Sequence, residues 1–307
     1  MCGRAEDLFL IITKEGKGFI DRKGHVVIPP GKWLPEPFFE GLSAVKVDGF
    51  YGYIDTSGAF VIKPQFELAG NFRDGLALVS RDRALQFIDH SGQTVIDLGR
   101  YQAANSFCDK LAGVALDSRW GFINTTGEVV IPIQFDKADC FENGLARVKL
   151  NDKWGFISKS GKLVIKPQFD FARGFSEGLA AIELNGKWGF IDNTGRIVIP
   201  CKYLNVHYFS EGLAAVSDGS PWGYVEKNGK MAIGYNYENA MEFRDGLAPV
   251  EKDSKYGFID KAGKTMIPFQ FTTAYPFGRG LALVDVGTWE SPDWCYIDEA
   301  GKIIWKQ

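Results

Sequence analysis

A short stretch that ends in a glycine recurs along the chain and limits what the chain can fold into. It reads Lys-Trp-Gly-Phe-Ile-Ser-Lys-Ser-Gly at residues 153–161 and Lys-Trp-Gly-Phe-Ile-Asp-Asn-Thr-Gly at residues 187–195. The first glycine of the stretch, here called the slot glycine, returns every 34 or 35 residues, with a last step of 38. It is found at Gly18, Gly52, Gly121, Gly155, Gly189, Gly223 and Gly257, and two further copies have Gln86 and Cys295 in its place. Self-similarity at a period of this size predicts a tandem array of nine repeats.

Each copy carries the pattern of a strand that runs into a tight turn. An aromatic and a β-branched residue follow the slot position in every copy, and a second glycine comes four residues later, as in Phe190, Ile191 and Gly195. Aromatic and β-branched residues favour strands, and glycine supplies the positive φ of a hairpin turn. The polar residue that opens the turn, such as Asp192, is expected to cap it rather than to bind calcium, because it stands alone in its loop.

The fifth repeat illustrates the expected order of strands. We predict a first strand at Phe135-Asp136, a turn at 141–144, and further strands at 145–150, 153–157 and 162–165, the last ending near Pro167. Useful helical periodicity is absent. The expected fold class is therefore all-β, with nine tandem antiparallel meander repeats of 34 or 35 residues stacked as a propeller-like array.

Both faces of each predicted sheet are apolar, which indicates how the repeats associate. In the sixth repeat Leu179 and Ala181 point to one face and Ile182 to the other. Sheets covered on both sides are expected to stack face to face, in a closed ring or in an open superhelix. The slot glycine would leave room for an aromatic ring of the neighbouring repeat. The tryptophans of this ladder are expected to be core residues at positions 120, 154, 188, 222 and 294.

Irregular repeats mark the two ends and one internal position. We expect a single repeat domain over residues 1–307, with an N-terminal capping unit at 1–40 and a C-terminal capping unit at 281–307. The first repeat begins at Leu8 without a first strand of its own, and the last contains an insertion at residues 287–293. The third repeat departs internally, with Leu85-Gln86 in place of Trp-Gly.

The combined pattern FxEGLAxVxxxxKWGFIDxxGxxVIxPxF resembles the WG-repeat family, also called KWG repeats, which is common in bacteria. The match covers nearly the whole chain and is most faithful from Trp120 to Gly246. The resemblance implies an all-β repeat scaffold without established catalytic residues. It also implies an interaction module, of a kind often found in multidomain or cell-envelope proteins.

Charge and motifs argue against several classes of function. The net charge of −3 gives no general attraction to nucleic acid. The apolar runs are far shorter than the roughly 20 residues of a transmembrane helix. The chain contains no P-loop, GxGxxG or GxSxG pattern, and its histidines fall in different phases of the repeat at His25, His90 and His207. We therefore expect no catalytic residues, no cofactor and no metal.

Cysteine usage bears on the compartment, which the sequence leaves unknown. Cys108, Cys140, Cys201 and Cys295 fall at different phases without CxxC spacing, so we expect isolated thiols and a lean to the cytoplasm. In the alternative, Cys2-Gly3 behind an added methionine is the lipid-attachment site of a bacterial envelope lipoprotein.

Taken with the absence of catalytic motifs, the repeats predict a non-enzymatic scaffold that binds a protein or peptide. The alternatives are a carbohydrate or cell-wall binding module and, more remotely, a propeller-type hydrolase. Inward-pointing repeated aromatics would favour the first and outward-pointing ones the second. Trp33 and Trp289 lie in irregular loops, where binding residues concentrate. The candidate ligand-binding residues are Trp33, Tyr101, His207, Tyr208 and Trp289.

Overall fold

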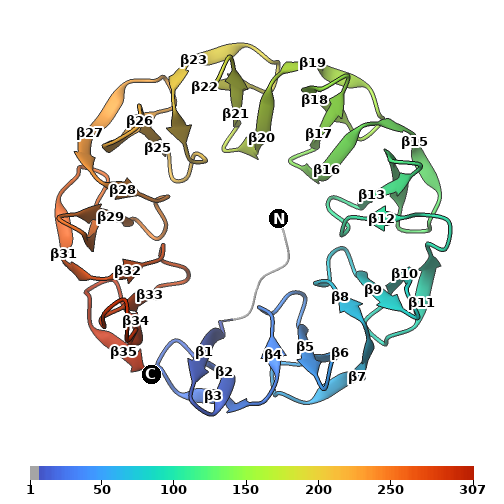
Figure 1. The fold of residues 1–307 in the computed structure, drawn as a ribbon, viewed down its shortest axis with the longest axis horizontal. Coiled ribbons are helices and arrows are strands. Elements are labelled where there is room, and N and C mark those ends of the chain that lie inside the picture. The colour runs from blue at the N-terminus through green and yellow to red at the C-terminus, as the bar shows by residue number, and fades with distance from the viewer. Residues whose placement is uncertain (1–6) are drawn as a thin grey trace. The chain divides into compact units, whose positions relative to one another are not determined.

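Nine small antiparallel sheets make up the computed structural model, which describes residues 7–307 (Figure 1). One sheet has three strands and eight have four, and no helix occurs among the described residues. The chain divides into two compact units, residues 1–167 and 168–307. The predicted all-β class and the tandem meander repeats are confirmed.

Unit 1 contains the first five sheets. The first consists of β1 (Phe9–Thr13), β2 (Gly16–Ile20) and β3 (Val26–Gly31). The second consists of β4 (Leu34–Pro35), β5 (Ser43–Val47), β6 (Phe50–Ile54) and β7 (Phe60–Phe66), and the third of β8 (Leu68–Ala69), β9 (Ala77–Arg81), β10 (Ala84–Ile88) and β11 (Thr94–Asp97). The fourth consists of β12 (Ala103–Ala104), β13 (Leu111–Leu116), β14 (Arg119–Asn124) and β15 (Val129–Phe135). The fifth consists of β16 (Lys137–Glu142), β17 (Leu145–Leu150), β18 (Lys153–Ser158) and β19 (Leu163–Phe169), whose last two residues belong to unit 2.

Unit 2 contains the other four sheets. The sixth consists of β20 (Phe171–Ser176), β21 (Leu179–Leu184), β22 (Lys187–Asp192) and β23 (Ile197–Tyr203), and the seventh of β24 (Asn205–Val206), β25 (Leu213–Ser217), β26 (Trp222–Glu226) and β27 (Met231–Tyr237). The eighth consists of β28 (Asn239–Ala240), β29 (Ala248–Lys252), β30 (Lys255–Ile259) and β31 (Thr265–Phe271). The ninth consists of β32 (Thr273–Ala274), β33 (Ala282–Asp285), β34 (Trp294–Ile297) and β35 (Ile303–Lys306).

Within each unit the sheets follow one another along an arc (Figure 1). The first strand of a sheet, such as β8 in unit 1 or β28 in unit 2, lies on the concave side of that arc, and the fourth strand, such as β11 or β31, on the convex side. The first sheet begins directly with β1, which confirms that the described part of the first repeat lacks one strand. The meander order therefore places the first strands of each unit along one surface.

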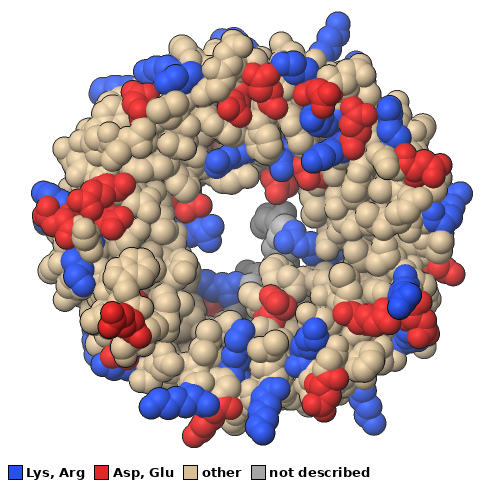
Figure 2. Space-filling view, in the orientation of Figure 1, with Lys and Arg blue, Asp and Glu red and all other residues tan. Residues whose placement is uncertain are grey.

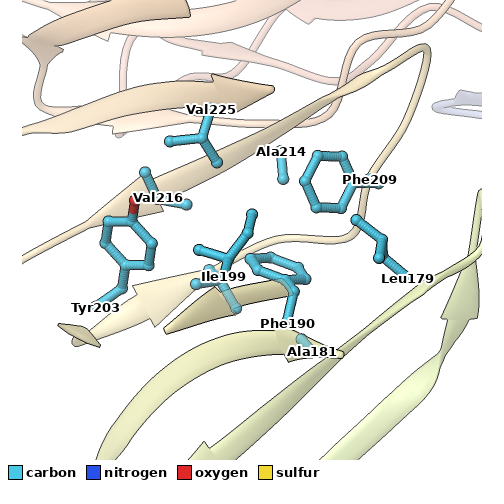
Figure 3. Close-up of a cluster of buried hydrophobic side chains, with 10 residues drawn as sticks. Leu179, Ala181, Phe190, Ile199, Tyr203, Phe209, Ala214, Val216 and Val225 are labelled. Carbon is cyan, nitrogen blue, oxygen red and sulfur yellow. The ribbon is translucent and has the colours of Figure 1, made fainter. Parts of the chain in front are cut away.

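Consecutive sheets pack face to face through apolar clusters, as predicted. Between the sixth and seventh sheets, Leu179, Ala181 and Phe190 of one sheet meet Val216 and Val225 of the next (Figure 3). All these side chains are buried. Alternate residues of a strand face opposite sides, so the seventh sheet contributes one face to the cluster with the sixth sheet and the other to the cluster with the eighth.

The aromatic residue after the slot position is the core ring of every repeat, but the tryptophan before the slot is not. In all nine repeats the former is at most 8% exposed: Phe19, Tyr53, Phe87, Phe122, Phe156, Phe190, Tyr224, Phe258 and Tyr296. Among the tryptophans only Trp154 is buried, at 6%, whereas Trp120, Trp188, Trp222 and Trp294 are partly exposed. The prediction of a buried tryptophan ladder is therefore wrong for four of the five, because the ring lies at the start of its strand, near the sheet's end.

The slot glycine is required by its own sheet, and the prediction that a ring of the neighbouring repeat fills the gap is wrong. A Cβ on Gly189 would lie 2.5 Å from the carbonyl oxygen of Ile199 in β23. Between β22 and β23, Trp188 pairs with Tyr203 and Phe190 with Ile199, so β23 carries two extra residues opposite the glycine. This bulge brings main chain onto the glycine. Across the seven slot glycines, the corresponding distances run from 2.5 to 2.8 Å.

Where the slot glycine is missing, the bulge is missing too. In the third sheet Gln86 pairs with Asp97 and the next residue with Ile96, without a shift at this point. In the ninth sheet Cys295 pairs with Lys306, again in continuous register with the next pair. The fourth strands of these sheets have four residues, against seven in β23. A side chain in the slot is thus tolerated because no extra main chain crosses it.

The bulge also explains why the predicted strand boundaries were wrong. The fourth strand of the fifth sheet runs to Phe169 instead of ending before Pro167. A proline costs no ladder hydrogen bond at a bulge. Likewise Phe135, predicted to start the fifth repeat, closes β15 of the fourth, where it pairs with Trp120. In the fifth repeat, β16 extends to Glu142, which leaves a tighter turn than predicted.

The polar residues that open the turn between the third and fourth strands cap it, as predicted. Asp192 Oδ1 accepts hydrogen bonds from the main-chain nitrogens of Thr194 at 3.0 Å and Arg196 at 3.0 Å, and from the Thr194 hydroxyl at 2.6 Å. These donors, led by the Thr194 hydroxyl, lower the pKa of Asp192 to about 2. Asn124 makes the same main-chain bonds in the fourth repeat, so the cap needs an oxygen acceptor and not a charge.

Acidic residues of the first hairpin turn join a sheet to the next one in six sheets, namely the second to the fourth and the sixth to the eighth. Glu177 accepts hydrogen bonds from the main-chain nitrogen of Gly212 at 2.9 Å and from Lys227 Nζ, which lies 3.1 Å away. Five further acidic residues accept a main-chain hydrogen bond from the turn of the following sheet in the same way: Glu40, Asp74, Asp109, Glu211 and Asp245. Together with Glu177 they are here called the clip acids. Acidic residues followed by glycine at positions 40, 74, 177, 211 and 245 are typical of turns in sequence, and the structure adds that they link one sheet to the next.

The remaining predictions on organisation are not tested by these observations. The single domain over 1–307 and the capping units at 1–40 and 281–307 stay predictions. Cys2 and Gly3 lie outside the described residues, so the lipoprotein alternative also stays open. Residues 7–307 contain no helix with the length and apolarity needed to cross a bilayer.

Candidate functional site

One position on the concave strands changes its chemistry from repeat to repeat. Its main-chain nitrogen donates to the second strand of the same sheet, as in Asn105 to Gly113 at 2.8 Å and His207 to Ala215 at 2.8 Å. This position, here called the first-strand row, is occupied by Glu36, Gly70, Asn105, Asp139, Arg173, His207, Met241 and Tyr275. The residue just before it is apolar throughout and mostly alanine. The fold therefore constrains the preceding residue and leaves the row free to vary.

Side chains of the first-strand row lie against the half-buried ring that precedes the slot. The guanidinium of Arg173 lies 4.9 Å from the ring centroid of Trp188. The ring centroids of His207 and Trp222 are 5.1 Å apart. Each pair belongs to one sheet, so the third strand supplies a fixed aromatic platform and the first strand supplies the variable group.

In unit 2 two consecutive sheets combine these pairs into one surface. Arg173 also lies over the ring of Tyr208, 5.5 Å from its centroid, so its guanidinium is held between rings of the sixth and seventh sheets. Phe171 meets Trp188 edge to face at 5.8 Å. Phe171 and Tyr208 are 37% and 39% exposed, so the surface is open to a ligand. We call it the aromatic patch, consisting of Phe171, Arg173, Trp188, His207, Tyr208 and Trp222.

The aromatic patch carries one cation that has no acidic partner. Among residues 7–307, Arg173 contacts two rings but no carboxylate at ion-pair distance. Burial lowers the pKa of His207, Glu242 opposes that effect, and the charge of Arg173 adds to it. Acidic and basic side chains are otherwise interspersed on the visible face of each unit (Figure 2). The patch thus presents a fixed guanidinium suited to a carboxylate or another planar anion.

Two of the five predicted site residues come together in this patch. His207 and Tyr208 are adjacent members of it, whereas Trp33 and Tyr101 belong to unit 1. The Nε1 of Trp33 donates to the carbonyl oxygen of Lys17 at 2.7 Å, and its half-buried ring packs on the first apolar cluster. Tyr101 is only 9% exposed and is a core residue between the third and fourth sheets. Their contacts are internal to the fold.

Trp289 stands apart at the tip of the insertion in the ninth repeat. The buried Asp285 carboxylate anchors the loop by accepting hydrogen bonds from the main-chain nitrogens of Gly287 at 2.8 Å and Asp293 at 2.7 Å. The loop is therefore ordered at its base. Its tryptophan is 86% exposed and contacts no other aromatic ring within residues 7–307.

A hollow lies in unit 1 beside the clip acid Asp74. It has a volume of about 420 Å³ and is lined by Asp74, Gly75, Leu76, Lys110 and Thr125. Lysine pairs with the clip acid in other repeats, as Lys159 does with Asp109, and the shorter Thr125 occupies that lysine position here. The hollow is explained by this missing side chain.

Sequence reasoning missed Arg173 and Phe171. The sequence does contain a feature that could have identified Arg173. When the repeats are aligned on the slot glycine, Arg173 and His207 occupy the same position, and the residues at this position in the other repeats share no common chemistry. The predicted candidates lie in irregular loops instead, because binding residues concentrate in such loops.

The fold defines an all-β tandem-repeat protein with four-stranded meander blades of propeller type. A family model for the WG containing repeat matches residues 18–33, 51–82, 87–120, 120–154, 154–188, 188–220, 222–256 and 256–287. The chain belongs to this WG-repeat family, as the resemblance of its motifs predicted.

Solved structures with a related chain path share little sequence with this protein. Kluyveromyces lactis Hsv2p is 12% identical, with 87% of this chain and 94% of that chain covered at a TM-score of 0.44. The extracellular domain of the putative hybrid two component system BT3049 from B. thetaiotaomicron is 10% identical, with 98% and 57% covered at a TM-score of 0.31. Likeness of this extent carries no inference about function. A search of curated proteins finds no match.

Proposed function

We propose that the protein is a non-enzymatic scaffold that binds a protein or peptide through the first-strand surface of unit 2. In this proposal Arg173 pairs with an acidic side chain of the partner. The observation that carries it is the partly exposed guanidinium that lies over both Trp188 and Tyr208 and, among residues 7–307, forms no ion pair with a carboxylate. The WG-repeat fold supports a scaffold role in general.

The geometry of the patch favours recognition of a carboxylate. Rings on both sides hold the guanidinium plane, so little side-chain freedom is lost when an anion binds its edge. The flanking rings offer apolar contact to the rest of a peptide. Bidentate pairing between arginine and carboxylate is among the stronger polar contacts in proteins. An acidic peptide therefore fits the patch better than a basic or purely apolar one.

The non-enzymatic part of the proposal rests on the roles of the repeated carboxylates. Asp192 caps a hairpin turn and Glu177 joins two sheets, and their equivalents do the same in other repeats. Each has a structural task that recurs along the array. A hydrolase would instead need carboxylates gathered in one pocket with divergent pKa values.

A peptide array tests the proposal on the full chain. Acidic peptides should bind and matched peptides with amide side chains should not. Arg173→Ala should weaken the best acidic peptide at least about tenfold, the value expected for loss of a charge-assisted pair. Arg244→Ala, which removes an exposed arginine elsewhere in unit 2, should leave binding unchanged. Equal affinity in wild type and Arg173→Ala would refute the proposed site.

Carbohydrate binding is the second candidate, and Trp289 is the observation that favours it. A ring that is 86% exposed on an anchored loop can stack on a sugar. The buried state of all nine repeated core rings counts against a repeated sugar-binding surface. Binding on a glycan array that is lost in Trp289→Ala and kept in Arg173→Ala would replace the first proposal by this one.

A further inference from the structure

Two cysteines of consecutive sheets in unit 1 meet, although 31 residues separate them in the sequence. Cys108 follows the short first strand β12 of the fourth sheet, and Cys140 lies in β16, the first strand of the fifth. The Sγ of Cys140 lies 3.6 Å from the carbonyl oxygen of Ser106, two residues before Cys108, and each thiol shifts the pKa of the other. Both are free thiols, and their proximity is not visible in the sequence, because sequence phase does not reveal which positions of neighbouring repeats face each other.

The repeat itself explains why these positions meet. In the sixth and seventh sheets the residues equivalent to Cys108 are serines that reach across to the next sheet. Ser176 Oγ donates to the carbonyl oxygen of Phe209 at 2.7 Å, and Ser210 Oγ to that of Phe243 at 2.6 Å. Each acceptor lies one residue beyond the position equivalent to Cys140. A cysteine at the serine position thus faces the next sheet where Cys140 stands.

The surroundings of the pair favour an ionised sulfur. Arg73 Nη1 lies 3.9 Å from the Sγ of Cys108, and the Sγ of Cys140 lies 3.6 Å from the carbonyl oxygen of Ser106. The Cys108 thiol lowers the pKa of Cys140, with the charge of Arg73 acting in the same direction, while the Cys140 thiol raises the pKa of Cys108. Cys140 is only partly buried, so it is the sulfur that ionises first and that a small oxidant reaches.

We propose that Cys108 and Cys140 form a reversible disulfide that covalently joins the fourth and fifth sheets. With hydrogen peroxide as oxidant, the Cys140 thiolate attacks one peroxide oxygen and the O–O bond breaks, which gives a sulfenic acid and a hydroxide ion that takes a proton from the solvent to become water. Cys108 then attacks this sulfur, the S–O bond breaks, and a second water leaves. The two thiols lose two electrons in total and peroxide gains them. A dithiol reductant reverses the reaction through a mixed disulfide.

Mass spectrometry of the full chain tests this proposal. After treatment of the reduced protein with hydrogen peroxide, the intact monomer should lose the mass of two hydrogen atoms. Proteolysis without reductant should release one cross-linked peptide that contains both residues. The melting temperature should rise by several degrees and return on addition of a dithiol, because the bond closes a loop of the unfolded chain.

Serine variants provide matched controls, since serine is the natural residue at the Cys108 position in the sixth and seventh sheets. Cys108→Ser and Cys140→Ser should each fold and lose both the cross-link and the rise in melting temperature. Cys201→Ser should keep both. A product in which Cys140 is oxidised but not joined to Cys108, a cross-link between two chains, or thiols that survive peroxide would each overturn the proposal.

Discussion

The slot glycine of the sixth sheet, Gly189, allows a direct test of how the repeat is built. An alanine Cβ at this position would lie 2.5 Å from the carbonyl oxygen of Ile199 and 2.7 Å from the nitrogen of Cys201. Both are main-chain atoms of the bulge in β23, so a side-chain rotation cannot relieve the contact. Overpacking of a core costs about 1–3 kcal/mol when side chains can adjust. Because main chain has to move here, we expect Gly189→Ala to lower the free energy of unfolding by about 3 kcal/mol or more.

Gly278 is a matched control in the same unit. A Cβ there would meet nothing within 4 Å, and its φ is not in the left-handed region. Gly278→Ala should therefore change the free energy of unfolding by less than about 1 kcal/mol, with stabilisation as the favoured sign because alanine restricts the unfolded chain. Urea unfolding followed by tryptophan fluorescence gives both values from the midpoint and slope. If Gly189→Ala unfolds at the midpoint of Gly278→Ala, the bulge does not explain the conserved spacing of glycine within the array.

Three further outcomes are expected from the same urea assay. Trp188→Ala should cost about 2 kcal/mol and Phe190→Ala about 3–5 kcal/mol, because only the second ring is fully buried; equal losses would contradict this ranking. Glu211→Ala should cost about 1–2 kcal/mol through the lost main-chain acceptor, against less than about 0.5 kcal/mol for its exposed partner in Lys261→Ala; the reverse order would refute the clip. The folded-state pKa of Asp192, about 2, lies below its usual 3.8, so its stabilisation is complete above the usual value and disappears as pH falls through about 2. Asp192→Asn should therefore lose less stability than wild type across that window, and identical losses would contradict the cap.

The number and period of the repeats could be predicted from sequence because each hairpin has a glycine at a fixed distance from an aromatic residue. The bulge could not, since the partner of Gly189 lies ten residues further on in the same sheet, at Ile199, and nothing in either residue indicates that they touch. Pro167 is a second reason why the predicted boundary of a fourth strand is wrong. Pro167 was interpreted as the end of a strand, whereas the bulge lets it stay inside one.

The candidate site was predictable only where it is irregular. His207 and Tyr208 were found because they are unusual in their connector. Arg173 is an ordinary residue type, and its importance arises from two rings that belong to different sheets. The contact between Cys108 and Cys140 was missed for the same reason. Contacts between repeats depend on how sheets stack, which a single repeat does not encode.

The fold and the candidate binding surface use different positions of one repeat. Positions that face a neighbouring sheet, such as the ring at Phe190, need the same chemistry in every copy because each sheet contacts similar neighbours. The first-strand row has no such requirement, since its main chain makes the same hydrogen bond whatever its side chain. A change at Arg173 or His207 can therefore alter the ligand without disturbing the bulge or the clip acids. For this reason we infer that differences in binding between repeats reside in the first-strand row rather than in the motif that identifies the family.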